Sequence, residues 1–181
     1  MTGQKIPLDK IGYWSELKLE IIKKYAEAYS KILKKQKGLK HLYIDAFAGT
    51  GVHLSKKTEE IVPGSPLNAL NVQPPFYEYH FIDKNEKKIE FLKTISQGRS
   101  NVEIYHGDCN SILVDQVFPK VRYEDYKRGL CFLDPYGLHL NWEVIQQAGT
   151  MGTIDIFLNF PIYDMNLNVL LCDPSKARPR E

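Results

Sequence analysis

The pattern of apolar and polar positions near the N-terminus is helical. Between Ser15 and Lys37 apolar residues recur every three or four positions: Leu17, Ile21, Ile22, Tyr25, Tyr29, Ile32 and Leu33. Lysines fill the opposite face, and Gly38 follows as a residue type that commonly ends helices. The pattern predicts a long amphipathic helix in an N-terminal region, 1–40, that packs on the rest of the protein.

Beyond this helix, short β-rich runs alternate with helical ones. Strands are predicted at 41–47, 77–83, 101–106, 130–134 and 153–160, and helices or helical turns at 66–72, 85–97, 110–118 and 142–147. The alternation predicts an α/β fold, a Rossmann-like parallel sheet with helices on both faces. We expect this domain at 41–165, followed by a disordered tail at 166–181.

Polar residues stand at the carboxyl ends of all five predicted strands. They are Asp45, Asp83, Asp108, Asp134 and Asn159. In open α/β sheets ligands bind along that edge. A series of four acids and an asparagine is hard to explain by solubility alone, so the sequence predicts a ligand site there.

The first of these ends carries the segment Asp-Ala-Phe-Ala-Gly-Thr-Gly at 45–51. Glycine lets backbone approach a ligand closely, and it tolerates a sharp turn. We expect the segment to form the donor site of S-adenosylmethionine, with Phe47, Gly49 and Gly51 near the nucleoside. Asp45 would accept from the amino group of the methionine moiety. The alternative is a plain strand-to-helix turn.

Two further acids are candidates for reading the nucleoside. Asp83 can take both ribose hydroxyls, and Asp108 can meet the adenine amino group, with Cys109 supplying a backbone amide. Either acid could instead be a helix N-cap. In dinucleotide folds the ribose acid follows the glycines by about 20 residues. Asp83 comes later, which disfavours a nicotinamide cofactor and makes the stretch with Gly64-Ser65-Pro66 an insertion.

The sharpest chemical signal is Asp134-Pro135-Tyr136-Gly137, which directly follows an apolar strand. Proline stops the strand and leaves the carboxylate and the ring at the sheet edge. The segment resembles the Asp-Pro-Pro-Tyr motif of amino-methylating enzymes, although Tyr-Gly replaces the second proline and the aromatic. The resemblance implies that Asp134 accepts from an amine and that Tyr136 stacks on a base, as in base-flipping enzymes.

Composition adds few constraints. With 181 residues and 43% apolar content, one domain is expected. No apolar run of about 18 residues and no secretory signal are visible, so we expect a cytoplasmic protein without a membrane segment. A net charge of +2 falls short of a dedicated nucleic-acid binder.

The cysteines and histidines predict no metal site and no disulfide framework. Cys109, Cys131 and Cys172 lack the close pairs of a zinc ribbon, and the five histidines show no ligand spacing. Cys131 lies within a strand rather than on a loop, which argues against a cysteine nucleophile and carbon methylation.

Taken together, these residues resemble the three-Cys-motif partner (TcmP) family. The matching elements are the helix with Lys18 and Tyr25, segment 43–51, Gly64-Ser65-Pro66, Phe81-Ile82-Asp83, Gly107-Asp108, segment 132–137 with Trp142, and Asn159-Phe160. The resemblance implies a methyltransferase-like fold and a cysteine-motif partner protein. Family members usually continue beyond Asn-Phe, so the last strands of a complete methyltransferase fold are expected to be missing.

Two functions follow as hypotheses. The first is an S-adenosylmethionine-dependent methyltransferase that acts on an amine of a nucleic acid. The alternative is a non-catalytic partner module, which keeps the fold and works with a cysteine-motif protein. The acid series favours the enzyme, and the imperfect Asp-Pro-Tyr-Gly motif favours the module.

Overall fold

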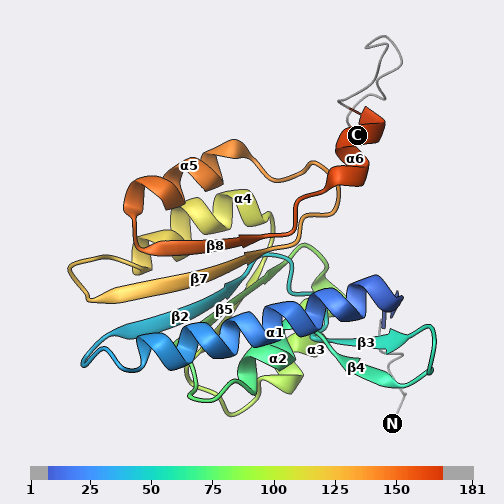
Figure 1. Ribbon diagram of the computed structural model, residues 1–181, viewed down its shortest axis with the longest axis horizontal. Coiled ribbons are helices and arrows are strands. Elements are labelled where there is room, and N and C mark those ends of the chain that lie inside the picture. Colours follow the sequence, from blue (N-terminus) through green and yellow to red (C-terminus); the bar gives the residue numbers. More distant parts are fainter. Residues whose placement is uncertain (1–7, 169–181) are drawn as a thin grey trace.

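Five parallel strands form one central sheet in the computed structural model, which describes residues 8–168 (Figure 1). The strands are β2 (Lys40–Asp45), β5 (Glu78–Asp83), β6 (Val102–His106), β7 (Lys127–Leu133) and β8 (Ile154–Leu158), in the order β6-β5-β2-β7-β8. The chain runs outward from β2 to β6 and then returns to β7 on the other side of β2. These are the five strands predicted from the sequence, so the Rossmann-like α/β fold is confirmed.

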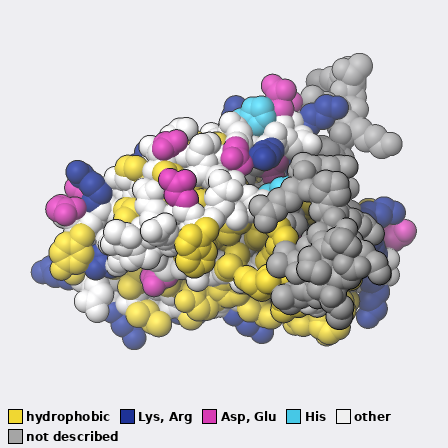
Figure 2. Space-filling view, turned by 90° about the horizontal axis from the view of Figure 1, so that it is seen from above, with side chains coloured by type: hydrophobic (Ala, Val, Ile, Leu, Met, Phe, Trp, Pro, Cys, Tyr) yellow, Lys and Arg dark blue, Asp and Glu magenta, His cyan; other side chains and the backbone are white. Residues whose placement is uncertain are grey.

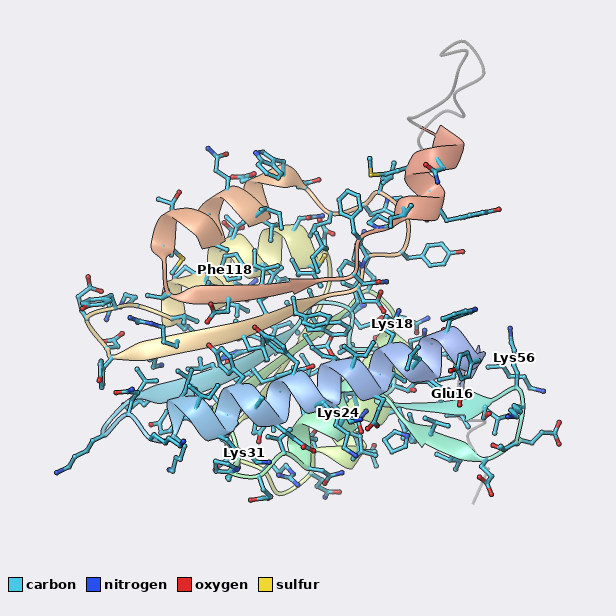
Figure 3. All side chains as sticks on the ribbon, viewed as in Figure 1. Glu16, Lys18, Lys24, Lys31, Lys56 and Phe118 are labelled. Atoms are coloured by element: carbon cyan, nitrogen blue, oxygen red, sulfur yellow. The ribbon has the colours of Figure 1, made fainter. Side chains whose placement is uncertain are left out.

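Helices cover both faces of this sheet (Figure 1). One face carries α1 (Tyr13–Leu33), α2 (Ser65–Leu70) and α3 (Glu86–Ile95). The other carries α5 (Trp142–Met151) and α4 (Cys109–Ile112), which continues through a π-helical turn, Leu113–Val117, and a 3-10 turn, Phe118–Lys120. Phe118 is labelled on that side in Figure 3. Successive residues of β2 alternate between the two cores, because strand side chains point to opposite faces.

Helix α1 packs on the sheet, but of the predicted apolar stripe only Ile22 is buried; the other buried positions of the helix are Leu19, Ala26 and Ser30. Ile22 and Ala26 are 1% exposed, and the Ser30 hydroxyl lies 2.8 Å from Nε2 of His41 in β2. Gly38, with φ of +82°, lies in the turn that leads to β2 rather than at the helix end. The outer side of α1 exposes Trp14, Leu17, Ile21, Tyr25 and Ile32. Figure 2 shows hydrophobic side chains gathered along that side of the molecule.

The predicted insertion is a β-hairpin. Strands β3 (Val52–Ser55) and β4 (Ile61–Pro63) pair antiparallel, and β1 (Lys10–Ile11) adds to β3 in parallel. At the hairpin base Gly64 N donates to Gly51 O over 2.8 Å. Gly51 has φ of +80°, and a Cβ there would lie 2.6 Å from Ile95 Cδ1. The glycine segment therefore leads into a hairpin, and α2 begins only at Ser65.

The described chain ends in α6 (Ile162–Asn168), which follows β8. Residues 166–168 of the predicted tail belong to this helix, and the rest of the tail, 169–181, lies outside the described residues together with Cys172. Within residues 8–168 no helix is both long enough and apolar enough to cross a membrane.

Candidate functional site

A cavity of about 320 Å³ opens at the carboxyl edge of the sheet, beside the ends of β2, β5 and β6. Its described lining comprises Ala46, Phe47, Asp83, Lys84, Gly107, Asp108, Cys109, Tyr136 and His139. Five of these are site residues predicted from the sequence: Phe47, Asp83, Asp108, Cys109 and Tyr136. The volume lies at the small end of the range for ligand pockets, about 300–1,000 Å³.

Asp83 is held in place by backbone. Its Oδ2 accepts from Gly49 N over 2.9 Å, and its Oδ1 accepts from Asn85 N over 2.7 Å. The N-cap of α3 is Asn85, which accepts from Lys87 N and Lys88 N, so Asp83 is not the helix cap. A carboxylate has about four acceptor positions, and two of them remain for hydroxyl groups of a ligand.

Asp108 stands at the first residue before α4, but its side chain makes no capping bond. Oδ1 lies 3.3 Å from Nζ of Lys84, and Nδ2 of Asn110 lies 3.3 and 3.4 Å from the two carboxylate oxygens. The Lys84 partner is a surface lysine, so this pair contributes little to stability. Asp108 is therefore placed by its neighbours and faces the cavity.

The remaining cavity wall is largely apolar. Phe47, Ala46 and Cys109 come from the ends of β2 and the start of α4, and Tyr136 comes from the loop after β7. Burial raises the pKa of the Cys109 thiol to about 11, so the side chain is neutral and apolar at physiological pH. An apolar, partly aromatic wall with two carboxylates fits a nucleoside.

Asp45 lies beneath this edge and is not part of the cavity lining. It is 0% exposed; its Oδ1 accepts from Phe47 N over 3.2 Å, and its Oδ2 has no partner. Burial raises its pKa to about 7; the nearby Ser65 side chain and the bond from Phe47 N oppose the shift, and the charges of Asp134 and Asp83 add to it. A ligand amine would reach Asp45 only after local opening.

The two glycines of the segment also act away from the cavity lining. Gly49 has φ of +63°, and its N–H donates to Asp83. Gly51 supports the hairpin and packs on α3. The glycines thus shape the site through Asp83 and the hairpin, while the residues of this segment that line the cavity are Ala46 and Phe47.

Asp134 is occupied by two residues from remote parts of the chain. Lys18 Nζ of α1 lies 2.5 Å from its Oδ2, and Asn159 Nδ2, after β8, donates to its Oδ1 over 2.7 Å. Figure 3 shows Lys18 on the side of α1 that faces the strand ends. Pro135 is buried, and Tyr136 is 89% exposed. The carboxylate of the Asp-Pro-Tyr-Gly segment is therefore already paired with the amine of Lys18.

Cys131 is an ordinary core residue. It is 0% exposed in β7, and burial raises the pKa of its thiol. A neutral, buried thiol is a poor nucleophile. Among residues 8–168 there is also no group of three or more His, Cys, Asp or Glu arranged to hold a metal ion.

Sequence reasoning did not assign roles to Lys84, His139, Lys18 and Asn110 at this edge. Lys84 directly follows Asp83 and so shares its strand end. Asn110 follows Asp108 by two residues and bridges it to the loop after β7 through His139 O, at 3.0 Å. No local sequence pattern marks Lys18 or His139, because their partners come from other elements. Lys18 pairs with Asp134 after β7, and the backbone O of His139 accepts from Asn110 of α4.

The fold defines a class, the Rossmann-like α/β proteins, in which ligands commonly bind at the carboxyl edge of the sheet. The structure is similar to the crystal structure of protein LPL1258 from Legionella pneumophila strain Philadelphia 1, of family DUF519, with a TM-score of 0.61 and 16% sequence identity. The match covers 81% of this chain and 67% of that chain, and it concerns the fold alone. No family model matches the sequence, and no curated protein is significantly similar.

Proposed function

We propose that this protein is a cytoplasmic S-adenosylmethionine-dependent methyltransferase that methylates an amine of a nucleic acid. The observation that carries the proposal is the cavity at the carboxyl edge, where Asp83 and Asp108 stand beside the Phe47 wall. The strand order supports the proposal. In doubly wound sheets ligands bind where successive connections run to opposite sides of a strand, and here that point lies beside β2, between β5 and β7.

On this proposal the cavity holds the nucleoside of the donor. Asp83, fixed by Gly49 N and Asn85 N, keeps acceptor positions for the two ribose hydroxyls. Asp108 accepts from the adenine amino group, and Phe47 packs on the ring. The bound donor would supply an electrophilic methyl group. The protein contributes mainly alignment, because methyl transfer depends on orientation more than on a strong base.

The acceptor would approach beside Tyr136 and Asp134. An amine that donates to Asp134 must displace Lys18 Nζ, which lies 2.5 Å from the carboxylate. During transfer the nitrogen forms a bond to the methyl carbon, the sulfur–carbon bond breaks, and the nitrogen loses a proton to solvent. The exposed ring of Tyr136 offers a stacking surface for a base.

Calorimetric titration tests the donor part of this proposal. Purified protein is titrated with S-adenosylmethionine, S-adenosylhomocysteine and NAD, and we expect binding of the first two only. Methyl transfer from labelled donor to bulk RNA and DNA then tests the acceptor part, with wild type, Asp134→Ala and Tyr136→Ala. Equal turnover in all three proteins would remove the acceptor assignment, and no donor binding by folded protein would remove the cofactor.

A second candidate is a non-catalytic module that works with a cysteine-motif protein, as the resemblance to the TcmP family implies. The observation favouring it is that both oxygens of Asp134 are occupied, by Lys18 and Asn159. Donor binding without label transfer to any nucleic acid, together with a stable complex with the partner on gel filtration, would make this candidate the better one.

A further inference from the structure

Asn110 joins the two halves of the cavity. It belongs to the first turn of α4, directly after the donor-side residues Asp108 and Cys109. Its Nδ2 donates to His139 O over 3.0 Å, and its Oδ1 accepts from Asn141 N over 2.8 Å. The segment 136–141 after β7 carries Tyr136 and His139 of the cavity wall. One side chain therefore connects the donor side to the acceptor loop.

The whole amide of Asn110 is used at this junction. Nδ2 faces a backbone carbonyl at His139 and the Asp108 carboxylate, whereas Oδ1 faces the backbone N–H of Asn141. Two donors and one acceptor in this arrangement fix the amide orientation, since a flip would oppose oxygen to oxygen. Aspartate lacks the two donors, and alanine lacks all three groups. The arrangement is specific to an asparagine side chain.

The loop that Asn110 holds begins with a glycine turn and an exposed ring. Gly137 has φ of +68°, a conformation that glycine adopts readily, and Tyr136 is 89% exposed. An exposed ring has few packing contacts of its own, so hydrogen bonds to the loop backbone help to set its position relative to a ligand at Asp108. The two bonds from Asn110 act at the far end of this loop, next to the start of α5.

We propose that Asn110 is a positioning residue that couples donor binding at Asp108 to the placement of the acceptor loop 136–141. The inference rests on the proposed function and adds to it a residue through which donor binding changes the position of the acceptor loop. Because coupling between two sites is reciprocal, a donor that engages Asp108 orders the loop, and an ordered loop strengthens donor binding.

Hydrogen exchange of loop 136–141, followed by mass spectrometry, tests this coupling. Without ligand, Asn110→Ala loses both bonds to the loop, and we expect its loop amides to exchange about tenfold faster than in wild type. S-adenosylhomocysteine should slow exchange of the loop in wild type and leave it unchanged in Asn110→Ala. A purely structural role would not produce this loss of ligand-dependent protection.

Two further variants sharpen the experiment. Asn101 makes a similar side-chain bond, from Nδ2 to Tyr77 O over 3.2 Å, away from the cavity. Asn101→Ala should therefore behave as wild type in the loop. Asn110→Asp keeps the acceptor for Asn141 N and loses the donors, so its ligand-free loop should exchange at an intermediate rate. It also replaces Asn110→Ala if circular dichroism shows that the alanine variant does not fold.

The outcomes separate the coupling from the proposed function. Equal ligand-free exchange in wild type and Asn110→Ala would overturn the tether, and equal protection by ligand in both would overturn the coupling. If S-adenosylhomocysteine does not bind wild type, the proposed function fails, and the ligand-free comparison alone then decides whether Asn110 holds the loop.

Discussion

The proposed donor and acceptor halves of the carboxyl edge are built in different ways. On the donor side Asp83 is fixed by backbone N–H groups, one of them two residues away, and Asp108 by Lys84 and Asn110. On the acceptor side Asp134 is bound by Lys18, 116 residues earlier, and by Asn159. The donor side is thus formed largely by its own strand ends and open to a ligand, whereas the acceptor side forms only when remote elements dock and is closed by a protein amine.

Asp45 lies between these halves and carries the largest expected effect. Its folded pKa is about 7, against 3.8 without the fold, so the folded state binds the extra proton between these pH values. Stability is therefore lost as pH rises from about 4 to 7, and the penalty persists above that range. Asp45→Asn removes it. We expect a gain of up to about 4 kcal/mol at pH 8 and much less at pH 5.

Urea denaturation at the two pH values measures this gain. The exposed acid Asp115 provides the control, since Asp115→Asn should change stability by less than about 0.5 kcal/mol at either pH. A loss of stability in Asp45→Asn at pH 8 would mean that the carboxylate is charged and satisfied in the fold. A gain would mean that an unfavourable acid is retained at this edge, as is common at functional sites.

The next effect concerns the donor side. Asp83→Ala should weaken binding of S-adenosylhomocysteine by about 1.5–3 kcal/mol, the range for a lost charge-assisted hydrogen bond. Because the change also frees Gly49 N, Asp83→Asn is measured beside it; the amide oxygen can still accept one bond, so its loss should be smaller. Calorimetric titration gives both values. Unchanged affinity in Asp83→Ala would remove the ribose assignment.

A smaller effect is expected on the acceptor side. A double-mutant cycle with Lys18→Met and Asp134→Asn should give a coupling energy of about 1 kcal/mol, because both side chains are only partly exposed. The exposed pair Lys24–Glu20, at 3.4 Å on the same helix, is the control and should give about 0.3 kcal/mol. If the two cycles agree within error, Lys18 is not held on Asp134 in solution, and the acid is free for an acceptor.

The same contrast explains how far the sequence could predict the site. The acids at the strand ends and the five sheet strands follow local rules, namely apolar runs closed by a polar residue or by proline, as at Asp134-Pro135. The partners of Asp134 follow no local rule, because a lysine on an amphipathic helix looks like any solvated lysine. Their contact depends on how α1 docks through Ile22 and Ala26.

The sequence predicted neither the three-stranded sheet β1-β3-β4 nor the burial of Asp45, and the reasons are related. Strand β1 has two residues and β4 has three, too short for an alternating pattern to be recognised, and β1 pairs with a strand 44 residues further on, as Lys10 with Leu54. The sequence places Asp45 at a strand end but cannot say that the fold buries it completely, beside Ser65 of α2. Exposure is a property of the assembled fold.

The smallest expected effect on stability belongs to Tyr136, whose side chain is 89% exposed. Tyr136→Ala should change the free energy of unfolding by less than about 0.5 kcal/mol, because little packing is lost. Its effect on methyl transfer should be much larger, about tenfold or more in turnover, if the ring stacks on the acceptor base. An interaction made with the acceptor lowers turnover and leaves donor affinity nearly unchanged.

Trp142→Ala is the matched control, since that ring is 74% exposed but outside the cavity lining. Turnover with RNA and DNA, donor affinity and urea denaturation are measured for both variants. Equal loss of turnover in the two would show that exposed aromatic surface in general, rather than the position of Tyr136 beside the cavity, governs the acceptor.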